Sequence, residues 1–309
     1  MPRLINNSMT MRIVITGATG FIGQNFIPML VENEPSVEIM TLNRSVEKAE
    51  KLFPQKHCRH ISVEEMEQIV DFKPDMVFHL ATLSTSRNDW EIIEPMMSAN
   101  LTFGVQLLHY VSQCPDLKLF VNIGTFAQYR LGTQQICDAY LYSATKTAFR
   151  QFVEYYSQLY GFKYVQLVPY TIYGGKDTAK KLIDYIIEAI TSDTPVDMTL
   201  GEQVLDFTHV EDVAGFFLHL IRNLDLFAGI RNGEEFHIGT GRGTTPRELA
   251  AIVEREFGKK CNINWGGRPY RPMDTMYAVA PIAKNLELLK WRAKVSVEEG
   301  VRRMRERIQ

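Results

Sequence analysis

The stretch TGATGFIG at residues 16–23 follows directly on the apolar run RIVI at residues 12–15 and opens an amphipathic segment. Glycines in this setting permit a tight turn, let the backbone approach a pyrophosphate and allow a helix to pack closely on a strand. The amino end of that helix supplies oriented N–H donors to an anion. We therefore expect a dinucleotide-binding turn at Gly17, Gly20 and Gly23; an ordinary strand-to-helix turn is the alternative.

Short apolar runs alternate with longer helix-like segments between residues 11 and 170. The apolar runs are RIVITG, VEIMTL, MVFHLA, LKLFVNIG and YVQLVPY, and the segments between them include 21–33, 45–56, 91–113 and 142–160. Several runs are almost continuously apolar, which is typical of strands that are buried on both faces. The pattern predicts an α/β fold with a doubly wound parallel sheet, a Rossmann domain over residues 11–170.

After residue 170 the pattern changes to longer loops, with helices near residues 179–191 and up to about 223. Residues 245–248 (TPRE) have the spacing of a capping box and predict another helix start. We expect residues 171–309 to form a smaller C-terminal substrate-binding lobe over the carboxyl ends of the strands. Some of its segments, such as 204–223, are expected to pack back on the Rossmann domain. Residues 1–10 are polar and are expected to be a loosely ordered leader.

The composition argues against nucleic acid and membranes as partners of the chain. Its 309 residues include 34 basic and 36 acidic side chains, so a net charge of −2 provides no electrostatic basis for binding nucleic acid or an anionic membrane. No apolar run approaches the roughly 18 residues of a membrane span, and the first residues lack the apolar core of a signal peptide. The four scattered cysteines fit reduced thiols in the cytoplasm. His57, Cys58 and His60 lack a second ligand pair, so no metal site is expected.

The end of the second predicted strand carries Asn43 and Arg44. A protein that binds NAD usually places an acidic residue here, against the ribose hydroxyls. A neutral side chain followed by a cation favours the 2′-phosphate of NADP(H), while NAD(H) stays possible. The alternative is that Arg44 is only a solvated loop charge.

A tyrosine and a lysine lie four residues apart in the segment YSATK at 142–146. Tyr142 and Lys146 would share one face of a helix, so the ammonium would lower the pKa of the phenol and contact the cofactor ribose. Thr125, after the strand LFVNIG, would assist at the substrate oxygen. Tyr140 is not the catalytic candidate, because the residue four positions after it is Ala144 and not a lysine.

Taken together, the motifs resemble the extended short-chain dehydrogenase/reductase family of nucleotide-sugar epimerases, dehydratases and reductases. The matching stretches, in the order of that family, are TGATGFIG at 16–23, HLAT at 79–82, NLTFGVQLL from 100, IGTFAQY at 123–129, YSATK at 142–146, VPYTIYGG at 168–175 and DFTHVEDVA at 206–214.

The resemblance implies a role for each matching residue. Those expected to bind the cofactor are Gly17, Thr19, Gly20, Phe21, Ile22, Gly23, Leu80, Ala81, Thr82, Asn100, Tyr142, Lys146, Pro169, Tyr170 and Ile172, in addition to Asn43 and Arg44. Asn100 would orient the loop beneath the cofactor, or would only cap a helix. Thr125 and Thr171 would face the sugar. Ser84, Lys181 and Arg271 are further residues expected to bind the substrate.

Two departures from the family pattern refine the expected function. The catalytic threonine of the dehydratases is followed by an acidic pair, whereas Phe126 and Ala127 follow Thr125 here, which argues against dehydration. Leu205 stands where many relatives carry an arginine that holds the substrate diphosphate. Candidate cations to replace it are Lys180, Lys181, Arg268 and Arg271.

The segments YGGKDTAKKLIDYII and GEQVLDFTHVEDVA resemble the branch that includes the CDP-paratose and CDP-abequose synthases. The expected activity is therefore an NADPH-dependent reduction of a nucleotide-linked 4-keto-6-deoxysugar, with hydride delivered to C4 and Tyr142 as the proton donor. A nucleotide-sugar 4-epimerase with tightly bound NAD(P) is the first alternative, and a non-catalytic dinucleotide-binding protein is the second. By the same resemblance, the partner is a nucleotide diphosphate sugar, and the chain forms a homodimer through segments 96–113 and 142–160.

Overall fold

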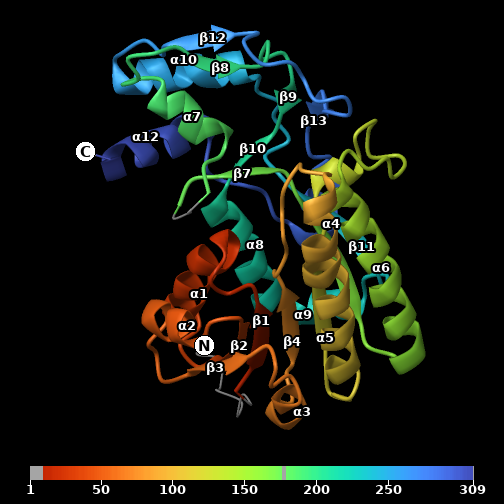
Figure 1. The fold of residues 1–309 in the computed structure, drawn as a ribbon. Helices are drawn as coiled ribbons and strands as arrows, with labels where there is room; N and C mark the ends of the chain where they lie inside the picture. Colours follow the sequence, from red (N-terminus) through yellow and green to blue (C-terminus); the bar gives the residue numbers. More distant parts are fainter. Residues whose placement is uncertain (1–9, 176–178, 309) are drawn as a thin grey trace.

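A seven-stranded parallel sheet forms the centre of the computed structural model, which describes residues 10–175 and 179–308 (Figure 1). The order of its strands is β11-β6-β5-β4-β1-β2-β3. Their bounds are β1 Arg12–Thr16, β2 Glu38–Asn43, β3 Cys58–Ser62, β4 Met76–His79, β5 Leu119–Ile123, β6 Tyr164–Pro169 and β11 Glu234–Ile238. The chain winds outward from β1 to β3, returns to β4 beside β1, and winds the other way. The predicted doubly wound sheet is confirmed.

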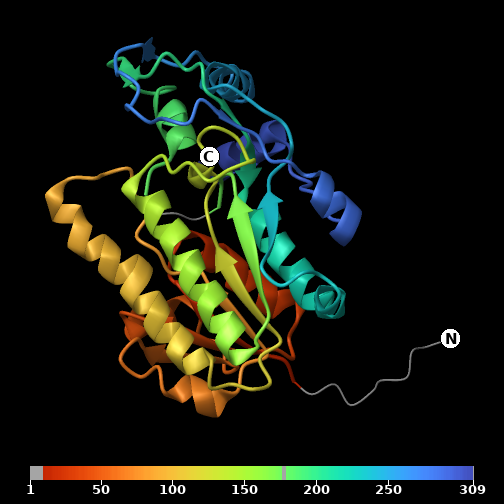
Figure 2. The ribbon, with the colours of Figure 1, turned by 90° about the vertical axis from the view of Figure 1, so that its right-hand side faces the viewer.

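Helices cover both faces of this sheet (Figure 2). They are α1 Phe21–Asn33, α2 Val46–Leu52, α3 Gln68–Phe72, α4 Trp90–Met97, α5 Phe103–Val111, α6 Leu141–Tyr160 and α8 Val210–Arg222. Successive strand side chains point to opposite faces. Ile15 therefore packs with Phe26 of α1 and Phe217 of α8, whereas Val14 shares the other core with Phe149 of α6. These two cores explain the continuous apolar runs of the strands.

Two of these elements differ from the sequence prediction. The pattern of residues 91–113 predicts one helix, but a π-helical turn at Ser98–Thr102 separates α4 from α5. Strand β3 was not predicted, because its sequence CRHIS is polar and it lies at the edge of the sheet. His60 within it is bonded through Nδ1 to Thr41 Oγ1 (2.6 Å) and through Nε2 to the carbonyl oxygen of Phe53 (2.8 Å).

The smaller lobe is built from short strands and three helices above the sheet (Figure 1). Its elements are β7 Thr171–Tyr173, β8 Val196–Met198, β9 Val204–Leu205, β10 Phe207–His209, β12 Ile263–Trp265, β13 Tyr277–Ala278, α7 Leu182–Glu188, α10 Pro246–Phe257 and α12 Val297–Ile308. Its core contains Phe207, Leu249 and Val301. The capping box of α10 forms as its sequence predicts, with the Thr245 side chain accepting from the Glu248 N–H (3.1 Å).

Part of the stretch 171–309 belongs to the main sheet rather than to the smaller lobe. Strand β11 pairs with β6, and α8 packs on α1. Helices α9 Leu224–Ala228 and α11 Ala283–Leu289 also lie on this side, where Phe227 and Leu289 join the core of the sheet. Residues 1–9 of the expected leader lie outside the described residues. Within the part of the chain that the structure describes, no helix has the length and apolar character needed to cross a membrane.

Candidate active site

The turn between β1 and α1 is shaped by glycines that a larger residue could not replace. Gly17 has φ +69°, and a Cβ atom there would lie 2.5 Å from the backbone nitrogen of Ala81. A Cβ atom on Gly23 would collide with the carbonyl oxygen of Ala18. The Gly20 N–H donates to the Gly17 carbonyl oxygen (3.0 Å). Helix α1 therefore starts tightly against β1, beneath the loop that follows β4.

The amino end of α1 is open to an anion. No side chain caps it, and its first turn contains no acidic residue. Phe21 and Ile22, which begin the helix, are half-buried, and the Thr19 carbonyl oxygen accepts from Gln24 Nε2 (2.8 Å). Unsatisfied N–H groups at a helix start bind phosphate well. The glycines and this uncapped helix start therefore fit the pyrophosphate of a dinucleotide.

The loop after β4 is tied to the glycine turn by a short chain of hydrogen bonds. The Ala81 N–H donates to Thr16 Oγ1 (3.1 Å), and the same hydroxyl is bonded to His79 Nδ1 (2.9 Å). Burial, with the nearby charge of Lys146, lowers the pKa of His79 to about 3. His79 is therefore neutral and packs among aromatic rings at the strand end, including that of Phe149.

The end of β2 carries no carboxylate. Asn43 is buried and donates its side-chain amide back to the strand, to the carbonyl oxygen (2.9 Å) and Oγ1 (2.8 Å) of Thr41. Arg44 follows it in an exposed bend, and no ion pair with Arg44 occurs within residues 10–175 and 179–308. The edge of the site where an adenine ribose would lie therefore presents a neutral amide and a cation.

Three hydroxyl groups surround the phenol of Tyr142, which lies in the first turn of α6. The side-chain hydroxyl groups of Ser84, Thr82 and Thr125 lie close enough to this phenol to influence its pKa. Thr82 and Ser84 come from the loop after β4, and Thr125 follows β5. Burial raises the pKa of Tyr142, while the three neighbouring hydroxyl groups act in the opposite direction, because they can donate hydrogen bonds to the phenolate. The arrangement assembles a hydroxyl cluster that can hold and protonate a carbonyl oxygen.

Lys146 lies one helical turn after Tyr142 on the same face of α6. Its side chain is buried, with 4% of the residue exposed, and burial lowers the pKa of the ammonium to about 8. A buried ammonium favours the ionised form of a neighbouring phenol. The spacing predicted from the sequence thus places a lysine of reduced pKa beside the hydroxyl cluster.

Asn100 lies in the π-helical turn and uses its whole side-chain amide to hold the loop of Thr82 and Leu83. It accepts from the Leu83 N–H (2.7 Å) and the Thr82 hydroxyl (3.1 Å), and donates to the Leu83 carbonyl oxygen (3.1 Å). It also donates to Thr145 Oγ1 of α6 (2.9 Å). Asn100 thus fastens the loop to α6, consistent with an orienting role rather than only a cap.

Gln128 holds Thr125 and was not identified from the sequence. Its Oε1 accepts from the Thr125 N–H (2.9 Å), and its Nε2 donates to Thr147 Oγ1 of α6 (2.9 Å). The Thr147 hydroxyl donates in turn to Asp138 (3.0 Å). Gln128 is fully buried. A signal was present, because Thr125 and Gln128 have the same capping-box spacing as Thr245 and Glu248.

The cleft beside Thr125 is aromatic. A cleft of about 80 Å³ is lined by Phe126, Tyr129, Tyr170, Tyr277 and neighbouring residues. The rings of Phe126 and Tyr170 stack with centroids 5.8 Å apart. The Tyr170 hydroxyl is bonded to His237 Nδ1 (3.1 Å), and the Tyr129 hydroxyl donates to Glu235 (2.5 Å). Both hydroxyl groups are therefore engaged away from the cleft.

The remaining residues expected at the nicotinamide and the sugar lie along β6 and β7. Pro169 is buried at the end of β6, and Ile172 packs against the core of the sheet. Thr171 is half-buried, and its Oγ1 atom is buried without a partner within the described chain. A buried hydroxyl of this kind is available to a ligand.

The four candidate cations of the diphosphate site lie in different places. Arg271 is exposed and pairs with Asp274 (3.7 Å), which accepts from the Tyr140 hydroxyl (2.5 Å) two residues before Tyr142. Lys180 pairs with Glu188 (2.8 Å), and Arg268 is exposed on a loop. Lys181 lies against the ring of Phe21 at the glycine turn, with Nζ 4.1 Å from its centroid.

Leu205, at the position of the expected arginine, bridges the backbone of Thr244 on one side and pairs with Ala278 of β13 on the other. Its backbone thus joins β9 to β13. Arg271 is linked through Asp274 to Tyr140, two residues before Tyr142.

Comparison with known proteins decides the family. The model of the NAD-dependent epimerase/dehydratase family matches residues 13–239. The chain belongs to this family. The CDP-abequose synthase of Yersinia pseudotuberculosis is 26% identical over 269 residues, which cover 86% of this chain and 91% of that protein.

Two solved structures share the fold of this epimerase/dehydratase-family chain. UDP-glucuronic acid 4-epimerase from Bacillus cereus, in complex with UDP-glucuronic acid and NAD, has a TM-score of 0.83 at 21% identity and covers 94% of this chain and 96% of its own. UDP-glucose 4-epimerase from Thermotoga maritima, with UDP-glucose, has a TM-score of 0.80 at 23% identity and covers 97% and 100%. The resemblance inferred from the motifs is confirmed, and the chain is an enzyme of nucleotide sugars that depends on a nicotinamide dinucleotide, as an epimerase or a reductase.

Proposed function

We propose that this enzyme is an NADPH-dependent reductase of a nucleotide-linked 4-keto-6-deoxysugar. The observation that carries the proposal is the hydroxyl cluster of Tyr142 beside the buried ammonium of Lys146. This set can bind and protonate a ketone oxygen. The residues after Thr125 are Phe126 and Ala127, so the position that bears the eliminating acids in dehydratases offers no proton acceptor.

Reduction of the ketone requires a hydride at C4 and a proton at the oxygen. Bound NADPH supplies the hydride. Thr125 donates a hydrogen bond to the ketone oxygen, and Tyr142 transfers its proton to that oxygen as the C=O π bond breaks. The charge of Lys146 stabilises the phenolate that is left. Thr82 and Ser84 are exposed residues beside the Tyr142 hydroxyl, and they offer a route by which a proton returns from water.

The end of β2 supports NADPH over NADH. Asn43 offers no negative charge that would repel a 2′-phosphate, and Arg44 offers a nearby cation. The Kd values of NADPH and NADH for the wild type and for Arg44→Ala test this directly. The variant is expected to bind NADPH about tenfold more weakly and NADH unchanged, because one charge-assisted phosphate contact is worth ~1.5 kcal/mol or more. Equal losses for both cofactors would contradict the preference.

The aromatic cleft beside Thr125 supports a deoxysugar. Because Tyr129 and Tyr170 use their hydroxyl groups elsewhere, the cleft presents ring faces that suit a methyl group better than a hydroxyl. The relatives named CDP-abequose synthase, at 24–26% identity, support a nucleotide-linked sugar of this class.

The activity is tested with purified enzyme, NADPH and a panel of 4-keto-6-deoxy nucleotide sugars that differ in base. Loss of NADPH absorbance, with stoichiometric appearance of the 4-hydroxy product, is the expected result. No oxidation of NADPH or NADH with any member of the panel would refute the reductase.

A nucleotide-sugar 4-epimerase is the second candidate, because solved structures with this fold are 4-epimerases. An epimerase returns the hydride to the same sugar and needs no external reductant. Protein that is purified with tightly bound nicotinamide, and that interconverts C4 epimers without added cofactor, would favour it.

We also propose a homodimer formed through α6. Phe152, Tyr155 and Leu159 lie on one exposed face of this helix, with 40%, 59% and 56% of their surface accessible. An apolar stripe of this size is typical of an interface with a second copy. Light scattering of the wild type is expected to give twice the 35.5 kDa chain mass, and Leu159→Glu to give the monomer. A wild-type monomer at micromolar concentration would refute this.

A further inference from the structure

Lys181 brings a cation of the smaller lobe to the glycine turn. It is the residue immediately before α7, and its N–H donates to the Asp184 carboxylate (2.7 Å), which defines the start of that helix. From there its side chain reaches back to the sheet, so that Nζ lies 4.1 Å from the centroid of the Phe21 ring. Phe21 is the first residue of α1. The contact joins the smaller lobe to the amino end of the helix that would face a pyrophosphate.

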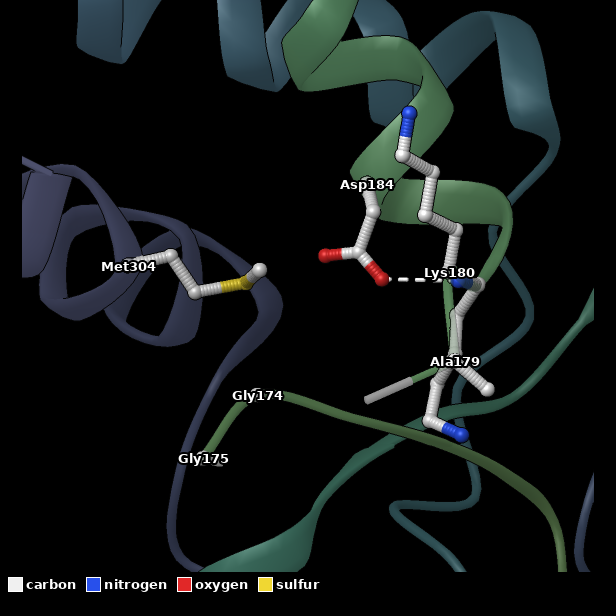
Figure 3. A pocket seen from close by; sticks show the side chains of 7 residues that line it. Gly174, Gly175, Ala179, Lys180, Asp184 and Met304 are labelled. Atoms are coloured by element: carbon white, nitrogen blue, oxygen red, sulfur yellow. Dashed lines mark hydrogen bonds between the residues drawn. The ribbon is translucent and has the colours of Figure 1, made fainter. Parts of the chain in front are cut away.

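Gly175, at the end of the segment that follows β7, also packs closely against α1. Gly175 has φ +68°, and a Cβ atom there would collide with the side chain of Asn25 in α1 and lie 2.6 Å from a methyl group of Val210. A hollow of about 280 Å³ adjoins this contact and is lined by Gly174, Gly175, Lys181, Asp184 and Met304, among others (Figure 3). Two separate contacts, one by glycine backbone and one by a lysine, therefore place this part of the smaller lobe beside the dinucleotide turn.

The glycine turn itself contains no positive side chain. Residues 16–23 include neither lysine nor arginine, and α1 carries no basic residue in its last turn either. A pyrophosphate carries about two negative charges, which the helix start balances only through partial charges. Lys146 is buried and lies beside Tyr142, one helical turn along α6. A cation held over the Phe21 ring is partly removed from water, which strengthens its attraction to an anion.

We propose that Lys181 binds the cofactor pyrophosphate, and that it does so instead of holding the diphosphate of the sugar substrate. The inference rests on the dinucleotide binding of the proposed function and is independent of the reaction that follows. Both lobes then contribute to the cofactor site, since α1 supplies N–H donors and the smaller lobe supplies the positive charge of Lys181.

The test compares Lys181→Met with Lys180→Met by measuring Kd values. Lys180 is the adjacent lysine, is exposed and pairs with Glu188, so it is a matched control for charge and position. The probes are NADPH, ADP-ribose, which keeps the pyrophosphate but lacks the nicotinamide, and CDP and UDP as nucleotide diphosphates. Each titration is repeated at high salt, which screens a charge contact.

Lys181→Met is expected to weaken NADPH and ADP-ribose by roughly 10- to 100-fold and to leave CDP and UDP within about twofold of the wild type. Lys181→Arg should recover most of the loss, and Lys180→Met should bind all probes like the wild type. Unchanged NADPH affinity in Lys181→Met, or a loss confined to CDP and UDP, would overturn the inference. If the wild type binds neither NADPH nor NADH, the proposed function itself fails, which is a different result.

Discussion

The hydroxyl cluster at the start of α6 and the cations of the smaller lobe are held in place by different means. Thr125, Lys146 and Asn100 are buried, and Thr125 and Asn100 are each held by defined hydrogen bonds. Arg271 and Lys180 are exposed, and each pairs with one carboxylate nearby in the sequence, Asp274 and Glu188. Reaction chemistry needs atoms placed to within a fraction of an ångström, because small displacements greatly reduce the rate. Recognition of an anion tolerates movement, so a cation can be supplied from another position, and Leu205 can stand where relatives carry arginine.

The largest effect is expected for Tyr142→Phe, which removes the proton donor at the centre of the cluster. The kcat should fall by roughly 10²- to 10⁴-fold, while the Kd of NADPH stays close to that of the wild type. Tyr140→Phe is the contrasting variant, because its hydroxyl bonds Asp274, the partner of Arg271, which we expect at the substrate diphosphate. It should raise the KM of the nucleotide sugar and preserve kcat. If the two variants lose kcat equally, the hydroxyl cluster is not the region that determines the reaction rate. A non-catalytic role for the cluster then gains support.

Gln128→Ala comes next, because this residue acts through Thr125 rather than on the substrate. Loss of the two hydrogen bonds that join Thr125 to α6 should lower kcat by about 10- to 100-fold, with little change in the KM of either substrate. Steady-state kinetics with a melting curve separates this effect from unfolding. Gln128→Glu retains an acceptor for the Thr125 N–H and should recover part of the rate; if it recovers none and the melting temperature falls, Gln128 is only structural.

Arg271→Ala tests the exposed side of the comparison. The KM of the nucleotide sugar should rise about tenfold with an unchanged kcat, because a charge contact to a diphosphate is worth ~1.5 kcal/mol or more. Arg231→Ala removes another exposed arginine, which pairs with Glu234 far from the cluster, and should have no effect. A loss of kcat in Arg271→Ala would show that the loop of Asp274 also positions the catalytic turn.

The smallest effect concerns pH. Burial lowers the pKa of Lys146 to about 8, so the ammonium is charged below that value and loses its proton above it. Because the charge stabilises the phenolate form of Tyr142, kcat/KM for reduction should decline as the pH rises through 8, by about twofold at the pKa itself. Lys146→Arg stays charged over this range and should lose the decline while retaining a lower rate. A pH profile flat to 10 in the wild type would refute the assignment.

The sequence by itself determined the features that depend on neighbouring residues. The strand, glycine turn and helix at residues 12–33 follow from local backbone preferences, and the continuous apolar runs predict a sheet buried on both faces. The shared helix face of Tyr142 and Lys146 follows from a spacing of four residues. The capping box at Thr245 is equally local.

The tertiary structure alone decided the features that join distant segments. Strand β3 has a polar sequence and becomes a strand through its pairing with β2, and β11 joins β6 from a stretch expected in the smaller lobe. Gln128 meets Thr147 across two elements, and Lys181 meets Phe21 across 160 positions of sequence. No local pattern encodes such pairs, because burial and contact between remote segments depend on how the whole chain packs.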